Sequence, residues 1–373
     1  MGGWTRGRKT VAVSRHHRVH CPAAAPSFVP PELPDGVEFD RYDLILSIGR
    51  NLAMKVASRS LIRALAAGRS PLLKHLVDNI DAPLRLSGEV ASLGDAALTS
   101  LSHDIGVGVA GLHMEAMGFV WRANGKEVLS QGERYPDYVW DSGVAGGGVV
   151  LSEAKGSAAI GGTFNGVEAR ARDGMFEQVE PRIGTKTMDY QDIVSGYAFG
   201  IFAAGGEDCR TAAYEAMNFA GSPRSGPGTS PSPAILQSHF GGVLRLLGID
   251  DDDENAAELL EGQVRFSVYG DEVNQFVVPA ATRSSSISPM MFDPSTFPAL
   301  SLPVAARALN LRFGIPDASR KKASRWPRFE RRREKLPRGV LAIAPDGLAL
   351  VGPRWRQWPP VVWKPGDGFQ PLG

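Results

Sequence analysis

Residues 136–155 read PDYVWDSGVAGGGVVLSEAK, and they decide how the middle of the chain is expected to fold. Two short runs of strand-forming residues, 138–140 and 149–151, lie on either side of the glycine-rich segment 141–148. Such runs around a glycine-rich segment are typical of two antiparallel strands joined by a turn. The stretch therefore predicts a β-hairpin.

The second strand of this hairpin carries charged residues whose spacing indicates a chemical site. Side chains alternate along a strand, so Glu153 and Lys155 are expected on one face and Ala154 on the other. Asp137 begins the first strand, where the hairpin brings its carboxylate beside that of Glu153. Two carboxylates beside an ammonium group form a hard oxygen site for Mg²⁺ or Mn²⁺, with a lysine able to hold a water molecule. The combination indicates hydrolysis; the alternative is a surface hairpin with solvated charges.

At these residues the sequence resembles the PD-(D/E)xK nuclease superfamily, through Pro136-Asp137 and Glu153-Ala154-Lys155. The resemblance implies an α/β fold of the restriction-endonuclease type, which is a mixed sheet flanked by helices with a core in the order α-β-β-β-α-β. It also implies that Asp137, Glu153 and the carbonyl of Ala154 bind Mg²⁺ or Mn²⁺. Lys155 would then orient or deprotonate the attacking water.

Two further candidates lie within residues 101–204, the part of the chain that the resemblance covers. Residues 164–180 are expected to form a helix, with Gln178 on the same face as its apolar side chains, Val167, Ala171 and Met175. Enzymes of this superfamily often place an amide near the lysine. They also often place an extra carboxylate on the first helix of the core, which precedes the hairpin. The resemblance therefore implies catalytic roles for Gln178 and Glu115. The alternatives are a glutamine bonded to backbone and a solvated glutamate at the edge of a helix.

A second motif, GVGVAG at residues 106–111, matches the dinucleotide-binding pattern GxGxxG. A dinucleotide site requires a strand before this pattern and an acidic residue at the end of the next strand. Neither feature is clear in this sequence. An apolar stripe instead predicts a helix in which the glycines allow close packing, and its members are Ile105, Val109, Leu112, Ala116 and Phe119. A nucleotide-dependent oxidoreductase that uses this segment is kept as an alternative.

Length and composition set the outer limits. The chain has 373 residues, enough for two domains, and its hydrophobic fraction of 43% is typical of a soluble globular protein. The net charge is +1, so affinity for nucleic acid has to come from local clusters. Two cysteines, Cys21 and Cys209, exclude a disulfide framework and favour a reducing cytoplasm. No apolar run reaches about 18 residues, so no membrane partner is expected.

Composition and periodicity divide the chain into four expected regions. Residues 1–36 are basic and then proline-rich, as in a disordered tail. Residues 37–100 have a helical pattern and are expected to form a cap on the nuclease core, residues 101–250. Residues 251–373 are expected to form a less regular accessory α+β region. Its strand-like segments are 264–269, 274–278, 339–343 and 348–351.

The accessory region contains a basic segment, residues 319–338, in which aromatic residues are interleaved. Arginines beside aromatic rings are suited to phosphate contacts and base stacking, although a solvated helix or linker has the same composition. The arginines expected to bind nucleic acid are Arg325, Arg328, Arg331, Arg332 and Arg333.

Together these features predict a Mg²⁺-dependent nuclease that hydrolyses phosphodiester bonds of nucleic acid, DNA in preference to RNA, in defence or repair. The alternative from a different class is a non-catalytic nucleic-acid-binding or scaffolding protein on the same fold. A homodimer is compatible with the sequence, which does not decide the oligomeric state.

Overall fold

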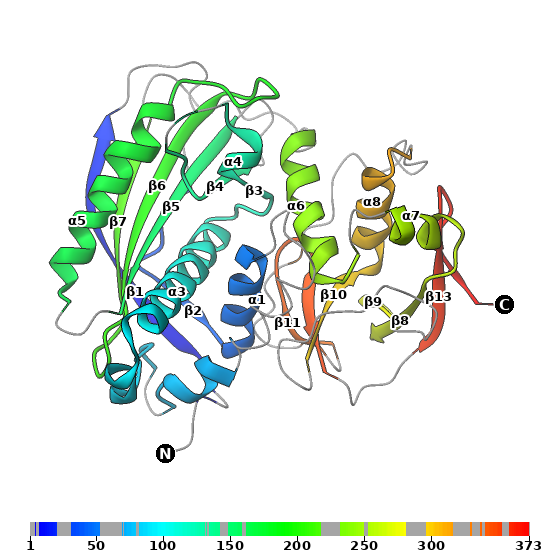
Figure 1. Ribbon diagram of the computed structural model, residues 1–373, viewed down its shortest axis with the longest axis horizontal. Helices are drawn as coiled ribbons and strands as arrows, with labels where there is room; N and C mark the ends of the chain where they lie inside the picture. Colours follow the sequence, from blue (N-terminus) through cyan, green and yellow to red (C-terminus); the bar gives the residue numbers. More distant parts are fainter. Residues whose placement is uncertain are drawn as a thin grey trace. The chain divides into compact units, whose positions relative to one another are not determined.

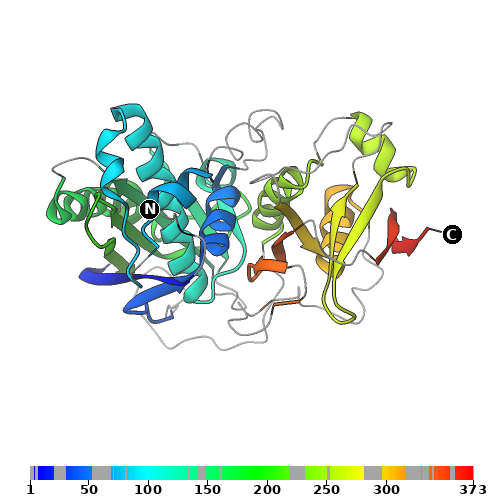
Figure 2. The same cartoon turned by 90° about the horizontal axis from the view of Figure 1, so that it is seen from below.

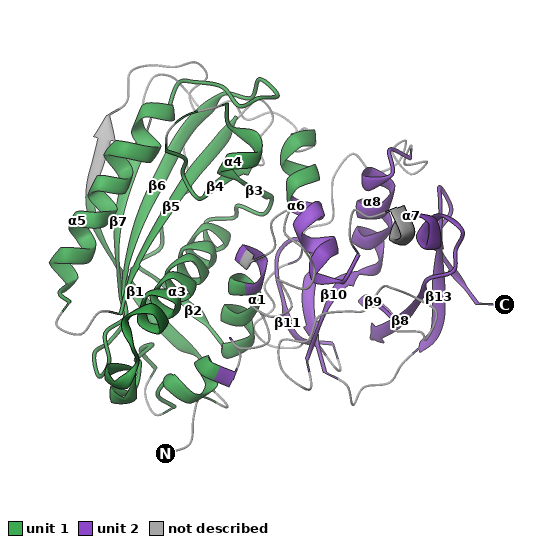
Figure 3. Cartoon of the chain, in the orientation of Figure 1, with its two compact units in different colours: residues 1–48, 72–238 green, residues 49–71, 239–373 purple. Residues whose placement is uncertain are grey.

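The protein has a mixed α/β structure, and its described residues form two seven-stranded sheets and several helices (Figures 1 and 2). The chain forms two compact units (Figure 3): unit 1 contains residues 1–48 and 72–238, and unit 2 contains residues 49–71 and 239–373. The computed structural model describes residues 4, 7–20, 31–52, 69, 71–79, 82–130, 132, 134–141, 148–158, 162–217, 232–249, 253–280, 296–315, 329, 336–337, 340–352 and 358–372. No helix within these residues is both long and apolar enough to cross a membrane.

The sheet of unit 1 has the strand order β2-β1-β7-β6-β5-β4-β3. Its strands are β1 (Lys9–His20), β2 (Gly36–Phe39), β3 (Arg122–Asn124), β4 (Tyr138–Asp141), β5 (Val149–Ser157), β6 (Ile193–Phe202) and β7 (Arg210–Met217). The pairs β5/β6 and β1/β7 are parallel and the other neighbours are antiparallel, so the sheet is mixed. Every residue of β6 is buried, as expected of a central strand.

The helical elements of unit 1 cover both faces of this sheet. They are α1 (Arg41–Leu52, which runs on into unit 2), η1 (Gly88–Ser92), α3 (Asp95–Ala116), α4 (Gly125–Val128), α5 (Phe164–Gly174), η2 (Met175–Val179) and η3 (Glu180–Arg182). The predicted order α-β-β-β-α-β is present as α3, β3, β4, β5, α5 and β6, with the short α4 inserted between β3 and β4. The predicted hairpin is also confirmed, because β4 and β5 pair antiparallel from Tyr138↔Ser152 to Asp141↔Val149.

Helix α3 crosses β5 at very close range, which explains its glycines. A Cβ atom on Gly106 would lie 3.0 Å from the Cα of Gly156 in β5. On the other side of the helix, a Cβ on Gly108 would lie 2.7 Å from Cγ1 of Ile48, and one on Gly111 would lie 2.7 Å from Oγ of Ser47. The GxGxxG pattern is therefore a helix-packing motif in the interior of α3. It does not form the strand-to-helix loop that a dinucleotide requires.

The prediction of a disordered tail over residues 1–36 is wrong for residues 9–20. They form β1, which pairs in parallel with β7 and antiparallel with β2. Val11 is fully buried, whereas Arg15 bonds to Glu32 at the surface. Basic side chains on the solvent side of a strand give the same composition as a disordered tail. The partner strand β7 lies about two hundred residues further along the chain, beyond the reach of local sequence patterns.

The predicted helical cap, residues 37–100, is wrong as a separate region. Residues 37–48 and 72–100 belong to unit 1, and residues 49–71 belong to unit 2. The first residues of the predicted cap are part of strand β2, whereas residues 71–76 are helical as the pattern predicted. The core therefore also extends beyond the predicted range 101–250, because it includes β1, β2 and α1.

Unit 2 is a regular antiparallel sheet with the strand order β11-β12-β10-β9-β8-β13-β14, so the expectation of an irregular region is wrong. The four predicted strand segments are present. The strands at residues 297–301, 358–364 and 368–371 and the helix at residues 302–312 were not predicted. The elements are α6 (Pro233–Leu246, which begins in unit 1), α7 (Asp253–Leu260), β8 (Arg265–Gly270), β9 (Gln275–Pro279), β10 (Phe297–Ser301), α8 (Leu302–Arg312), β11 (Val340–Ile343), β12 (Leu348–Val351), β13 (Trp358–Lys364) and β14 (Gly368–Pro371).

A buried ionic cluster lies in unit 2 around Asp346, in the turn between β11 and β12. Its Oδ2 is 3.0 Å from Arg50 Nη2 and 2.9 Å from His239 Nε2, and its Oδ1 accepts the Leu348 N–H at 3.1 Å. Burial opposes ionisation, but Arg50 and the hydrogen bonds from His239 and Leu348 outweigh it and hold the pKa of Asp346 well below its usual range. The carboxylate therefore ties the ends of α1 and α6 that belong to unit 2 to the β11–β12 turn.

Candidate active site

The candidate site lies where β5 extends beyond its partner β4. The pairing of β4 with β5 ends at Ser152, whereas β6 pairs with β5 on its other side from Val149 to Ser157. Asp137, just before β4, uses this edge of β5: its Oδ2 accepts the Ala154 N–H at 2.9 Å. Its own N–H donates to Oε2 of Glu153 at 2.9 Å. The hairpin thus brings the two carboxylates together, as predicted.

Glu153 is the centre of a group of polar side chains. Lys155 Nζ forms an ion pair and a hydrogen bond with Oε1 of Glu153, and Nε2 of Gln178 donates to the same oxygen at 3.0 Å. The Glu153 side chain is 2% exposed and that of Lys155 is 33% exposed. The carboxylate is therefore buried, and the ammonium group lies at the boundary with solvent.

Gln178 reaches Glu153 because the helix after β5 changes its geometry. The regular helix α5 ends at Gly174, and η2 is a π-helical turn over the next five residues. A Cβ on Gly174 would lie 3.1 Å from Cγ of Glu153 and 3.4 Å from Cε of Lys155, so glycine lets the helix lie against the charged pair. Single π-helical turns of this kind are frequent at functional sites.

The electrostatics of the pair make a cation favourable. Burial, and repulsion from Asp137, raise the pKa of Glu153 to about 7. Burial also raises the pKa of Asp137, against the opposing effects of the Ala154 N–H, Lys155 and His103. Two desolvated carboxylates that repel each other cost free energy when both are ionised, and a bound cation removes that cost.

The donor set fits a hard divalent ion. Among the described residues, no three His, Cys, Asp or Glu side chains come together as a metal site, so the side-chain donors here are the carboxylates of Asp137 and Glu153. Mg²⁺ is commonly held by one or two carboxylates, with water and substrate phosphate filling its other positions. The carbonyl of Ala154 is on the same stretch of β5 and is an available oxygen donor.

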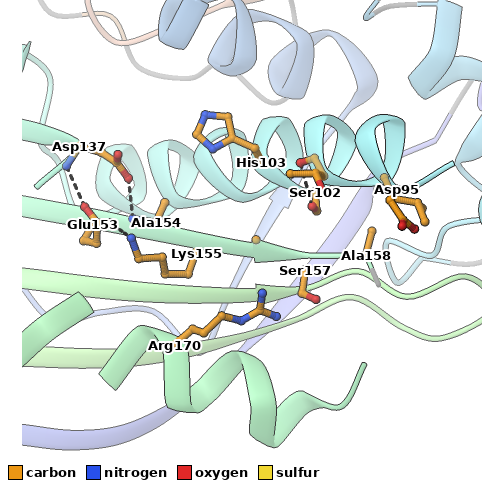
Figure 4. A pocket seen from close by; sticks show the side chains of 13 residues that line it. Asp95, Ser102, His103, Asp137, Glu153, Ala154, Lys155, Ser157, Ala158 and Arg170 are labelled. Carbon is orange, nitrogen blue, oxygen red and sulfur yellow. Dashed lines mark hydrogen bonds and ion pairs between the residues drawn. The ribbon is translucent and has the colours of Figure 1, made fainter. Parts of the chain in front are cut away.

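The charged group opens into a cavity of about 540 Å³ along the free edge of β5 (Figure 4). Helix α3 forms one wall, and Arg170 of α5 lies on the opposite side of the strand. The lining residues are Asp95, Leu98, Thr99, Ser102, His103, Asp137, Glu153, Ala154, Lys155, Gly156, Ser157, Ala158 and Arg170. The cavity contains the carboxylate of Asp137 together with the nitrogen groups of His103, Lys155 and Arg170.

His103 and Arg170 are lining residues that sequence reasoning missed. A signal for His103 was present, because residues 95, 99, 102 and 103 share one face of a helix that begins at Asp95. The predicted core began at residue 101, inside that helix, so residues 95 and 99 were assigned to a different region from residues 102 and 103. Arg170 is exposed on α5, and no local pattern distinguishes it from other surface arginines.

Glu115 does not join the site, so its prediction as a third acid is not supported by its position. It is buried in the last turn of α3 and does not line the cavity. His103 does line it, and Glu115 follows twelve residues later, about 18 Å further along the helix axis. The predicted nucleic-acid contacts at Arg325, Arg328, Arg331, Arg332 and Arg333 lie outside the described residues.

Comparisons with models of protein families, with curated proteins and with solved structures each find no match to the chain. The site is therefore characterised by its own geometry: Asp137, Glu153 and Lys155 line one cavity, and Gln178 bonds to Glu153.

Proposed function

We propose that this protein is a metal-dependent nuclease that hydrolyses phosphodiester bonds in nucleic acid, and that unit 1 is a nuclease fold of the PD-(D/E)xK type. The observation that carries the proposal is the convergence of Asp137, Glu153 and Lys155 on one cavity at the free edge of β5, with Gln178 bonded to Glu153. The element order of unit 1 supports the proposed fold. DNA is the first substrate to test.

Asp137 and Glu153, with the carbonyl of Ala154, would hold Mg²⁺ or Mn²⁺. When bound, the ion would act as a Lewis acid that stabilises negative charge on the phosphoryl oxygens. Gln178 fixes the orientation of Glu153 through the bond to Oε1, and the Ala154 N–H fixes that of Asp137. These bonds hold both carboxylates in place before any ligand arrives.

Lys155 is the residue placed to act on water. Its ammonium group pairs with Oε1 of Glu153 while a third of the side chain is exposed to the cavity. Its Nζ can orient the attacking water and, as a neutral amine, would accept the proton that the water loses as hydroxide forms. Asp137 and Glu153 act in binding, whereas Lys155 acts in the reaction.

Cleavage is expected to require a hard divalent ion. Purified full-length protein should cut circular or linear DNA with Mg²⁺ or Mn²⁺ and lose this activity in excess chelator. Ca²⁺ should support binding with little cleavage, because its coordination is looser. Gel assays with single- and double-stranded DNA and with RNA measure this directly. Undiminished cleavage in excess chelator would contradict the metal site.

Metal affinity is expected to rise as the pH increases through about 7. Glu153 has to lose its proton before it can bind a cation, and its pKa is raised from 4.5 to about 7. Without a bound cation, the stability of the folded protein changes with pH in the opposite direction. Between these two values the folded state keeps a proton that the unfolded chain has released, so the free energy of unfolding decreases as pH rises.

Thermal unfolding with and without Mg²⁺ across this pH range measures both effects. Asp137→Asn is the matched variant, because an amide oxygen can still accept the Ala154 N–H while one carboxylate charge is removed. It should weaken the metal-free pH dependence, of which burial of Glu153 keeps a part, and abolish stabilisation by Mg²⁺. Equal stabilisation of the parent by Mg²⁺ below and above the pKa of Glu153 would show that this carboxylate is not a ligand.

A further inference from the structure

Arg170 is a cationic side chain in the cavity whose role is not explained by the metal site. Its Nε donates to the carbonyl oxygen of Gly166 at 3.4 Å, one turn earlier in α5. Among the described residues it forms no ion pair with a carboxylate. In Figure 4 its guanidinium group points toward Ser157 at the end of β5, away from Asp137 and Glu153. This group is planar, and its nitrogens are suited to bidentate hydrogen bonds to two oxygens of an anion such as a phosphate.

The spacing of Lys155 and Ser157 along β5 is comparable to the repeat of a nucleic-acid strand, and Arg170 points toward Ser157. Ser157 follows Lys155 by two residues on β5, a distance of about 6.6 Å along the strand. This distance is comparable to one nucleotide of an extended strand. A phosphate beside Lys155 would therefore have its neighbour near Ser157, within reach of Arg170.

The walls of the cavity limit what lies in it. Helix α3 and Arg170 lie on opposite sides of β5, and the volume of about 540 Å³ is within the range that encloses a small organic ligand. A duplex is much wider than a single strand, because it has two backbones separated by grooves, of which the major groove measures about 12 Å across. Figure 4 shows Asp95 at the end opposite Asp137, where a carboxylate disfavours a further phosphate.

We propose that Arg170 binds the phosphate adjacent to the scissile one, and that the substrate enters the site as a single strand along the free edge of β5. This inference rests on the proposed nuclease function of the same site. It makes Arg170 a positioning residue, separate from the metal ligands and from Lys155.

The test compares two substrates of the full-length protein. One is a single-stranded oligonucleotide, and the other is bis(p-nitrophenyl) phosphate, which has one phosphodiester and no neighbouring phosphate. Arg170→Ala should lower kcat/KM for the oligonucleotide by about 10- to 100-fold, as expected for a lost bond to a charged group, and leave the small diester unchanged. Arg172→Ala is the control, because Arg172 is on the same helix, pairs with Asp173 and does not line the cavity.

Each outcome separates this inference from the nuclease proposal. If the parent cleaves both substrates and Arg170→Ala behaves like the parent on both, Arg170 has no role in binding the adjacent phosphate. If a blunt duplex is cleaved as fast as the single strand of the same sequence, entry as a single strand is wrong. Cleavage of neither substrate by the parent, in Mg²⁺ or Mn²⁺, counts against the nuclease.

Binding then tests Arg170 without cleavage. Fluorescence anisotropy with the single-stranded oligonucleotide at several salt concentrations should show a weaker complex for Arg170→Ala. The slope of log affinity against log salt is negative, and it should become less steep by about 0.7 for one lost phosphate contact. An unchanged slope would overturn the assignment, whether or not the protein is a nuclease.

Discussion

Lys155→Ala is expected to lower the turnover of DNA by about 10²- to 10⁴-fold at saturating metal, the range typical of a lost acid–base group. The ammonium group lines the cavity and pairs with Glu153. Its removal would leave the attacking water without its orienting group and keep both carboxylates in place. KM for the substrate should change little, because the lost interaction belongs to the transition state. Lys155→Arg should not restore the rate, since a guanidinium is bulkier and does not release its proton.

The measurement is cleavage kinetics on folded, monodisperse protein, together with a metal titration. Lys186→Ala is a suitable control, because Lys186 is an exposed lysine that pairs with Asp192 and does not line the cavity. The control should cleave at the parental rate. If Lys155→Ala also cleaves at that rate, the assignment of the active site is wrong. The non-catalytic nucleic-acid-binding protein then becomes the better hypothesis.

The second large effect concerns stability. Asp346→Ala is expected to destabilise unit 2 by about 3–5 kcal/mol, the usual cost of removing one partner from a buried ion pair. Both Asp346 and Arg50 have almost no exposed side-chain surface, so water cannot replace the lost carboxylate. Asp367→Ala, in the exposed turn between β13 and β14, should change the free energy of unfolding by less than about 0.5 kcal/mol.

The pH dependence of this effect has a defined sign. The pKa of folded Asp346 is lowered from 3.8, so its stabilising contribution is fully present above that value and is lost as the pH falls further. The difference in stability between the parent and Asp346→Ala should therefore be constant near neutral pH and shrink in acid. Urea unfolding gives the size, and amide hydrogen exchange in β10–β12 localises the change. A difference below about 1 kcal/mol at neutral pH would mean that the cluster contributes little.

The sequence alone determined the hairpin and the elements around it. Alternation in β5 was sufficient to place Glu153 and Lys155 on one face, and the structure has both beside Asp137. These features depend on neighbours a few residues away, and the period of a strand or helix encodes them directly. Helical periodicity also placed Gln178 on the face of Val167, Ala171 and Met175, but its bond to Glu153 is made from the π-helical turn η2, which a regular helical period does not encode.

Only the tertiary structure decided which distant segments meet. Strand β1 has the composition of a disordered tail and is ordered by pairing with β7. Glu115 and His103 are both polar residues on α3, but the crossing of α3 over β5 at Gly106 and Gly156 leaves His103 in the cavity and Glu115 outside it. Arg170 also joins the cavity through the packing of α5. Such placements depend on the crossing of packed elements, and no local period in the sequence specifies that crossing.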